Sequence, residues 1–306
     1  MRRPNKRPTA TVLFIGYIDF KLNHLTPIHA GSNLREAVAG TVNAPTLPQI
    51  TTDKGGPRHM SYEGLIAETV HINGHNGDQI DGYLARPLGS GPFPGVVLIH
   101  HMPGWDEASK EMARKFAYHG YACISPNLHF REGKGNAVDN STSVREAGGM
   151  PDDRTLGDVA AANAYLRTLP YHNGKVGVIG FCSGGRQTYL VSCRLDGFDA
   201  AVDCWGGGVT ATGDDLTERQ PVAPADYTAD MKCPILGLFG NEDARPSPAD
   251  VDATEALLKS NNKVHEFHRY DNAGHGFFAV DRPSYRQEAA VEGWSEVFKW
   301  YGKYLA

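Results

Sequence analysis

The chain has 306 residues, which suits one large α/β domain or two small ones with a buried core. Charged residues make up 21% and the net charge is −5 at pH 7, with no long basic run, so the composition gives no indication of a nucleic-acid partner. No segment approaches the ~20 consecutive apolar residues of a membrane span, so we expect no membrane partner.

Residues 1–59 differ from the rest of the chain. They contain scattered turn formers, including Pro45, Pro48 and Pro57, and no sustained hydrophobic period. We predict an N-terminal extension over 1–59, at least partly disordered, followed by one domain over 60–306. The basic start and the apolar run 11–18 are partly like a signal peptide. However, charged residues follow at once and no cleavage site closes the run, so we expect a cytoplasmic protein.

Strands and helices alternate through the predicted domain. Short apolar or alternating runs predict strands at residues 68–72, 79–85, 95–100, 121–125, 175–179, 200–205, 234–239 and 264–270. Helical periodicity predicts helices at about residues 106–119, 153–169, 183–195, 248–260 and 285–304. The polar, Gly-rich residues 129–151 predict a long loop. This alternation is typical of a mostly parallel sheet with helices on both faces.

The strongest motif is Gly180-Phe-Cys182-Ser-Gly184, which lies between a predicted strand and a predicted helix. This is the nucleophile-elbow pattern with cysteine at the position that usually holds serine. Glycines avoid collisions in a tight turn, and a helix N-terminus favours a thiolate. We predict Cys182 as the nucleophile and the backbone N–H of Ser183 as an oxyanion donor. The alternatives are a tight turn with a buried cysteine, or Ser183 as the nucleophile.

A base and an orienting acid follow in the expected order. His275 lies between two glycines after the last predicted strand, at the carboxyl edge of the sheet where open α/β sheets place their chemistry. Asp243 follows the strand 234–239, with Glu242 as the alternative acid. The order Cys182, Asp243, His275 is that of an α/β-hydrolase triad.

Other candidates are less specific. Met102 follows the strand 95–100, where the second oxyanion N–H is expected. Four further residues are expected either near the pocket or in plain packing and surface roles: Trp105, Trp205, Arg145 and Arg154. His100 and His101 have no third ligand at usable spacing, so no metal site is predicted. The remaining cysteines are expected to be reduced and to pack in the core: Cys123, Cys193, Cys204 and Cys233.

The chain resembles the dienelactone hydrolases (carboxymethylenebutenolidases) over roughly residues 62–305. The resemblance is carried by the residues 173–185 around the elbow, by the sequence Gly-Asn-Glu-Asp at 240–243, and by Ala-Gly-His-Gly-Phe at 273–277. It implies one eight-stranded α/β-hydrolase domain. It also implies a small ester or lactone as substrate, and no metal or organic cofactor.

The chain departs from the family pattern at two places. His101 stands where the family has a glutamate that hydrogen-bonds the resting thiol, so we expect His101 either to prime the thiolate as a cation or only to pack. The family also has an arginine shortly after the histidine that grips a substrate carboxylate, whereas this chain has no basic residue there before Arg282. We therefore expect neutral substrates to serve as well as carboxylated ones.

Two functions from other classes stay open at this stage. One is a non-catalytic α/β-hydrolase that binds a ligand or a partner protein. The other is a thiol redox sensor, which usually needs a resolving cysteine near Cys182. Cys193 is the nearest in sequence, but it is expected ~16 Å further along the predicted helix.

Overall fold

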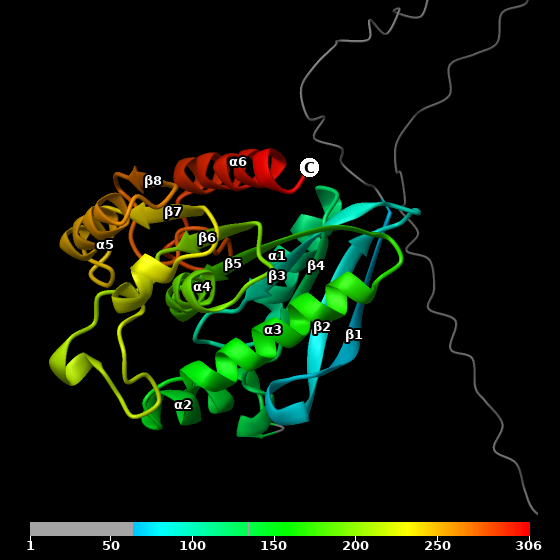
Figure 1. The fold of residues 1–306 in the computed structure, drawn as a ribbon, viewed down its shortest axis with the longest axis horizontal. Helices are drawn as coiled ribbons and strands as arrows, with labels where there is room; N and C mark the ends of the chain where they lie inside the picture. Colours follow the sequence, from blue (N-terminus) through cyan, green and yellow to red (C-terminus); the bar gives the residue numbers. More distant parts are fainter. Residues whose placement is uncertain (1–63, 134) are drawn as a thin grey trace, which may run out of the picture. The chain divides into compact units, whose positions relative to one another are not determined.

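The computed structural model describes residues 64–133 and 135–306. Eight strands form one sheet in the order β1-β2-β4-β3-β5-β6-β7-β8 (Figure 1). β1 and β2 pair antiparallel, β2 pairs antiparallel with β4, and all later pairs are parallel. The strands are β1 Leu65–Asn73, β2 Gln79–Pro87, β3 Phe93–Ile99, β4 Ala122–Pro126, β5 His172–Phe181, β6 Ala200–Cys204, β7 Ile235–Gly240 and β8 His265–Tyr270. The predicted mostly parallel sheet is confirmed.

Helices cover both faces of this sheet. They are α1 Glu107–Tyr118, α2 Ala137–Glu146, α3 Asp152–Thr168, α4 Ser183–Arg194, α5 Pro248–Ser260 and α6 Gln287–Tyr304. One buried cluster lies on each face of the sheet. Val96 and Leu98 of β3 pack with residues of α1 and α6, whereas Val97 and Ile99 pack with residues of α3 and α4. Successive strand residues point to opposite faces, so a strand buried on both sides reads as one continuous apolar run.

The predicted extension, residues 1–59, and the start of the predicted domain lie outside the described residues. Among the helices of the described part, none has the length and hydropathy needed to cross a membrane.

The prediction of a long loop over residues 129–151 is wrong, because α2 lies within it. Asn136 caps this helix, and its side chain accepts a backbone N–H of the first turn at 2.9 Å. Only Ser141 and Val144 of the helix are buried. With so few buried positions the segment carries no apolar period, so its sequence gives no helical signal. Arg145 therefore lies in the last turn of a helix.

Candidate active site

The chain turns sharply at Cys182, between the end of β5 and the first residue of α4. Its φ of 58° and ψ of −120° lie in a region that residues other than glycine rarely adopt. A Cβ on Gly180 would lie 2.0 Å from the carbonyl oxygen of Gly184, and one on Gly184 would lie 2.4 Å from that of Ile99. Both glycines are therefore required by close approach of the backbone, as the motif predicts.

His275 and Asp243 come together from the ends of two neighbouring strands. Nδ1 of His275 lies 2.8 Å from Oδ2 of Asp243, and the backbone N–H of Arg245 donates to the other carboxylate oxygen at 2.9 Å. Asp243 is buried, whereas Glu242 is exposed, so Asp243 is the acid that faces the imidazole.

The sulfur of Cys182 lies among hydrogen-bond donors. His275 and the backbone groups of Met102 and Ser183 are its hydrogen-bond partners. Burial by itself would raise the pKa of Cys182, but the bond and charge of His275 and the two backbone bonds lower it below the usual value. Burial likewise opposes the charge on His275, yet its bonds to Asp243 and Cys182 raise its pKa to about 10. The geometry therefore favours a resting thiolate–imidazolium pair.

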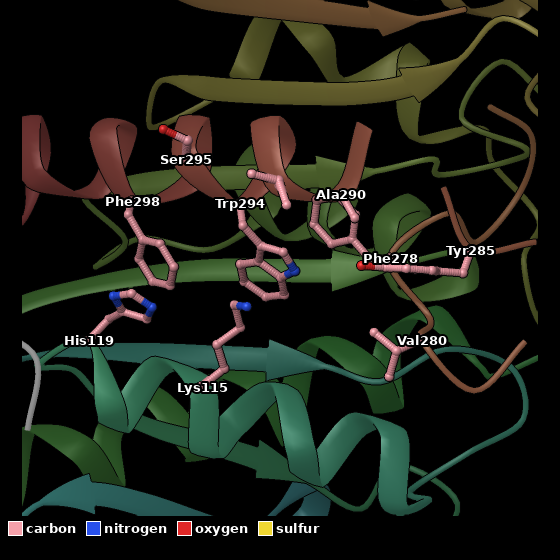
Figure 2. Close-up of a pocket in the computed structure, with 10 residues that line it drawn as sticks. Lys115, His119, Phe278, Val280, Tyr285, Ala290, Trp294, Ser295 and Phe298 are labelled. Carbon is pink, nitrogen blue, oxygen red and sulfur yellow. The ribbon is translucent and has the colours of Figure 1, made fainter. Parts of the chain in front are cut away.

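These groups open into a cavity of about 320 Å³. Of the residues singled out in the sequence, Cys182, His275, His101, Met102 and Trp205 line it. Arg145 lines it as well, and the remaining wall residues are Pro103, Ser109, Met112, Phe181, Gly276, Ala279, Arg282 and Ser284. A second cavity, between α1 and α6, shares no lining residue with the first (Figure 2).

Trp105 and Arg154 do not line the cavity. The indole N–H of Trp105 donates to the carbonyl of Ser125 at 2.9 Å, and the ammonium of Lys110 sits 4.1 Å from its ring centroid. Arg154 pairs with Glu132. Trp105 therefore packs in the scaffold, as its packing interpretation expected, whereas the Arg154 side chain is only 15% exposed and is not a plain surface residue.

His101 belongs to a group of polar side chains that the sequence did not reveal. Its Nε2 lies 2.7 Å from Oδ2 of Asp106, and Arg282 approaches the same oxygen at 3.6 Å. Burial would raise the pKa of Asp106, but its bonds to His101 and Ser109 lower it to about 2. The only sequence signal for Asp106 is its place before a helix, where it caps α1 by accepting the backbone N–H of Ser109 at 3.0 Å.

The neighbouring His100 has a different role. It is buried, it accepts the backbone N–H of Leu128 on Nε2 at 3.2 Å, and its ring meets that of His129 at 4.7 Å. Burial lowers the pKa of His100 to about 4. A neutral histidine held in this way is part of the core.

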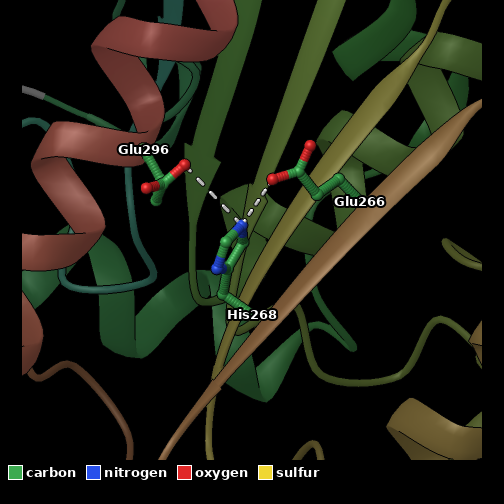
Figure 3. Close-up of side chains that lie close together, drawn as sticks. All are labelled: Glu266, His268 and Glu296. Carbon is green, nitrogen blue, oxygen red and sulfur yellow. Dashed lines mark hydrogen bonds and ion pairs between the residues drawn. The ribbon is translucent and has the colours of Figure 1, made fainter.

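In the described part of the chain, one group of side chains has a spacing that suits a metal ion: Glu266, His268 and Glu296 (Figure 3). His268 already pairs with Glu266 at 2.8 Å, and Lys299 pairs with Glu296 at 3.0 Å. None of these residues lines the cavity at Cys182. Because Lys299 already neutralises part of the charge, we interpret the group as a network of surface ion pairs.

The other four cysteines are free and buried, as expected. Burial raises the pKa of Cys193 to about 12 and that of Cys204 well above its usual value, so both thiols stay protonated. Cys204 lies beside the elbow, since its carbonyl accepts the backbone N–H of Cys182 at 3.0 Å. Sequence spacing singled out Cys193 and missed this cross-strand neighbour.

The fold and the site define an α/β-hydrolase. The model of the dienelactone hydrolase family matches residues 80–305. A "Putative carboxymethylenebutenolidase" of Methylorubrum extorquens is 33% identical over 244 residues, which cover 79% of this chain and 82% of that protein. A protein of the same name from Escherichia coli K12 is 32% identical over 74% of this chain and 84% of its own.

The solved structures agree. The crystal structure described as a "Putative Dienelactone Hydrolase" from Klebsiella pneumoniae is 28% identical with a TM-score of 0.72, and the match covers 79% of this chain and all of that one. The chain therefore belongs to the dienelactone hydrolase family, and it is a hydrolase of the ester and lactone class.

Proposed function

We propose that this enzyme cleaves a small ester or lactone through a covalent thioester on Cys182. The observation that carries the proposal is one chain of hydrogen bonds, from Asp243 through His275 to the sulfur, which ends at the elbow and opens into the 320 Å³ cavity. Nucleophile, base and orienting acid in this arrangement are the parts that acyl transfer needs.

In the first half of the reaction the thiolate attacks the carbonyl carbon. A C–S bond forms and the π electrons move to the oxygen, where the backbone N–H groups of Met102 and Ser183 stabilise the negative charge. The intermediate then collapses and the C–O bond breaks. His275 gives its proton to the departing oxygen, which leaves as an alcohol, or stays tethered to the acyl group when the substrate is a lactone.

In the second half a water molecule attacks the thioester. Neutral His275 takes a proton from this water, and Asp243 stabilises the imidazolium that forms. The C–S bond breaks, the acid is released and the thiolate is restored. Every proton is handled by this chain's own side chains, so the proposed mechanism uses no cofactor step.

The test is a panel of p-nitrophenyl acetate, neutral enol lactones and carboxylated lactones, each assayed with the wild type. We expect multiple turnovers on at least one class. A protein that binds these compounds and hydrolyses none would instead be the non-catalytic ligand-binding alternative. The raised pKa of both Cys193 and Cys204 argues against a redox sensor, because neither thiol suits a resolving role.

Substrate charge gives a separate prediction. Arg282 lines the cavity, but Asp106 balances part of its charge, and Arg145 is exposed at the wall. We therefore expect neutral esters and lactones to be hydrolysed about as well as carboxylated ones, compared as kcat/KM. A preference of about a hundredfold for the anionic substrate, or ~2.7 kcal/mol, would contradict this. Arg145→Gln and Arg282→Gln would then identify which arginine binds the carboxylate.

His101 gives a further prediction. The bonds to the sulfur come from His275, Met102 and Ser183, while the Nε2 of His101 is engaged by Asp106. We therefore expect His101→Ala to shift the midpoint for alkylation of Cys182 by less than about half a pH unit. His101→Glu is the matched comparison, because an anion close to the sulfur would raise the thiol pKa. A clear upward shift in both variants would show that His101 primes the thiolate.

A further inference from the structure

A second histidine–aspartate pair stands in the wall of the cavity at Cys182. Nε2 of His101 lies 2.7 Å from Oδ2 of Asp106, and His101 lines the same cavity as Cys182 and His275. The proposed reaction gives this pair no task, because the sulfur takes its hydrogen bonds from other groups. The imidazole of His101 is therefore available to bind another part of the substrate.

Asp106 decides which ring nitrogen of His101 carries the proton. Its carboxylate is ionised at neutral pH, because burial raises its pKa less than the bonds to His101 and Ser109 lower it. An ionised carboxylate can only accept hydrogen bonds. The proton of the neutral imidazole therefore sits on Nε2, and Nδ1 keeps a lone pair.

This lone pair is open to a ligand. The side chain of His101 is 12% exposed, and its Nδ1 has no hydrogen-bond partner in the described part of the chain, yet it is not sealed from solvent. His275 is held in the opposite sense, since Asp243 bonds its Nδ1 and its other nitrogen serves the sulfur. Because His101 lines the 320 Å³ cavity, a substrate that fills this cavity can reach its free nitrogen.

The charges around the cavity decide which kind of donor suits the free nitrogen. Arg145 and Arg282 line the same cavity, and Arg282 approaches Oδ2 of Asp106 at 3.6 Å. Two guanidinium groups disfavour an ammonium in this space. The donor is therefore neutral, and a hydroxyl group is a neutral donor that a small ester or lactone can carry.

We propose that His101 is a specificity residue whose Nδ1 accepts a hydrogen bond from a hydroxyl group of the substrate. Asp106 is the positioning residue that keeps this nitrogen unprotonated. The proposal names hydroxylated esters and lactones as the substrate class, and its kinetic test rests on the proposed hydrolysis. A substrate that covers the acceptor without supplying a donor loses binding energy, so an ether of the same skeleton should be a poorer substrate.

The kinetic test compares α-hydroxy- and β-hydroxy-γ-butyrolactone with their methyl ethers, as kcat/KM. For the wild type we expect a preference of about tenfold or more for one hydroxy lactone over its ether. His101→Phe keeps a ring in the wall but has no nitrogen, so it should abolish this preference.

Asp106→Asn gives a sharper outcome. The amide oxygen must still accept the backbone N–H of Ser109 at 3.0 Å, so the amide nitrogen takes the place of Oδ2 and donates to Nε2 of His101. The ring proton then moves to Nδ1, and His101 becomes a donor toward the substrate. We expect the preference to reverse toward the ether, measured against His101→Phe. A merely structural role would lower both rates and leave their ratio unchanged.

Nitrogen NMR of the imidazoles in Cys182→Ala gives a test without turnover, with the signals of His101 assigned by their loss in His101→Phe. At pH 8 we expect an unprotonated Nδ1 that shifts with the hydroxy lactone and not with its ether. A protonated Nδ1, no shift, or equal hydrolysis of lactone and ether would overturn the proposal and leave the hydrolase mechanism standing. The expected shift without hydrolysis of any lactone would overturn the mechanism alone.

Discussion

Cys182→Ala is expected to lower kcat/KM for p-nitrophenyl acetate by about 10⁴-fold or more. The nucleophile that His275 bonds at the elbow is the sulfur of Cys182, so covalent catalysis ends when this sulfur is removed. Oxyanion donors and the binding cavity stay in place, which sets the small residual rate. The measurement is the steady-state rate of the purified variant, with its melting temperature as the control for folding.

Ser183→Ala is the matched comparison. It removes the rival hydroxyl but keeps the backbone N–H that bonds to the sulfur. We expect its kcat/KM to fall far less than that of Cys182→Ala. If the two effects were reversed, Ser183 would be the nucleophile and the proposed mechanism would be wrong.

The second large effect is expected from variants of His275 and Asp243, the proposed base and its orienting acid. His275→Ala should lower kcat by about 10³-fold or more, because both proton transfers depend on this imidazole. Asp243→Asn should also reduce it strongly, since the carboxylate that holds Nδ1 at 2.8 Å is replaced by an amide.

These variants also change the pH dependence of alkylation of Cys182 by iodoacetamide. In the wild type the thiolate persists above the lowered pKa of Cys182, and His275 remains cationic up to about pH 10, so the ion pair spans the range between them. Without His275, burial is left as the dominant influence and the midpoint should rise to ~8.5 or above. An unchanged midpoint would mean that His275 does not activate the thiol.

Much of the site follows from local sequence. The glycines at 180 and 184 mark the elbow because a Cβ at either position would collide with backbone, a constraint that shows directly as residue type. Asp243 and His275 could be placed together because parallel strands bring their carboxyl ends to one edge of the sheet. The α/β order of strands and helices shows in the same way, through hydrophobic periods.

Other parts of the site depend on contacts that no local pattern encodes. The group formed by His101, Asp106 and Arg282 joins residues from two separate loops, and nothing in the sequence pairs them. Arg145 reaches the cavity on α2, a helix with too few buried residues to show a period. Trp105 was a candidate for the pocket by sequence position alone, whereas its indole N–H is directed to the carbonyl of Ser125.

The central claim is that a substrate acyl group passes through the sulfur of Cys182. The most direct measurement is mass spectrometry of the enzyme quenched in acid during turnover of a slowly hydrolysed aryl ester. We predict the mass of one acyl group, located by peptide mapping on the peptide that contains Cys182 and released by hydroxylamine as a thioester. Steady turnover with an acyl group on Ser183, or with none on Cys182 under conditions where acylation is faster than hydrolysis, would contradict the account.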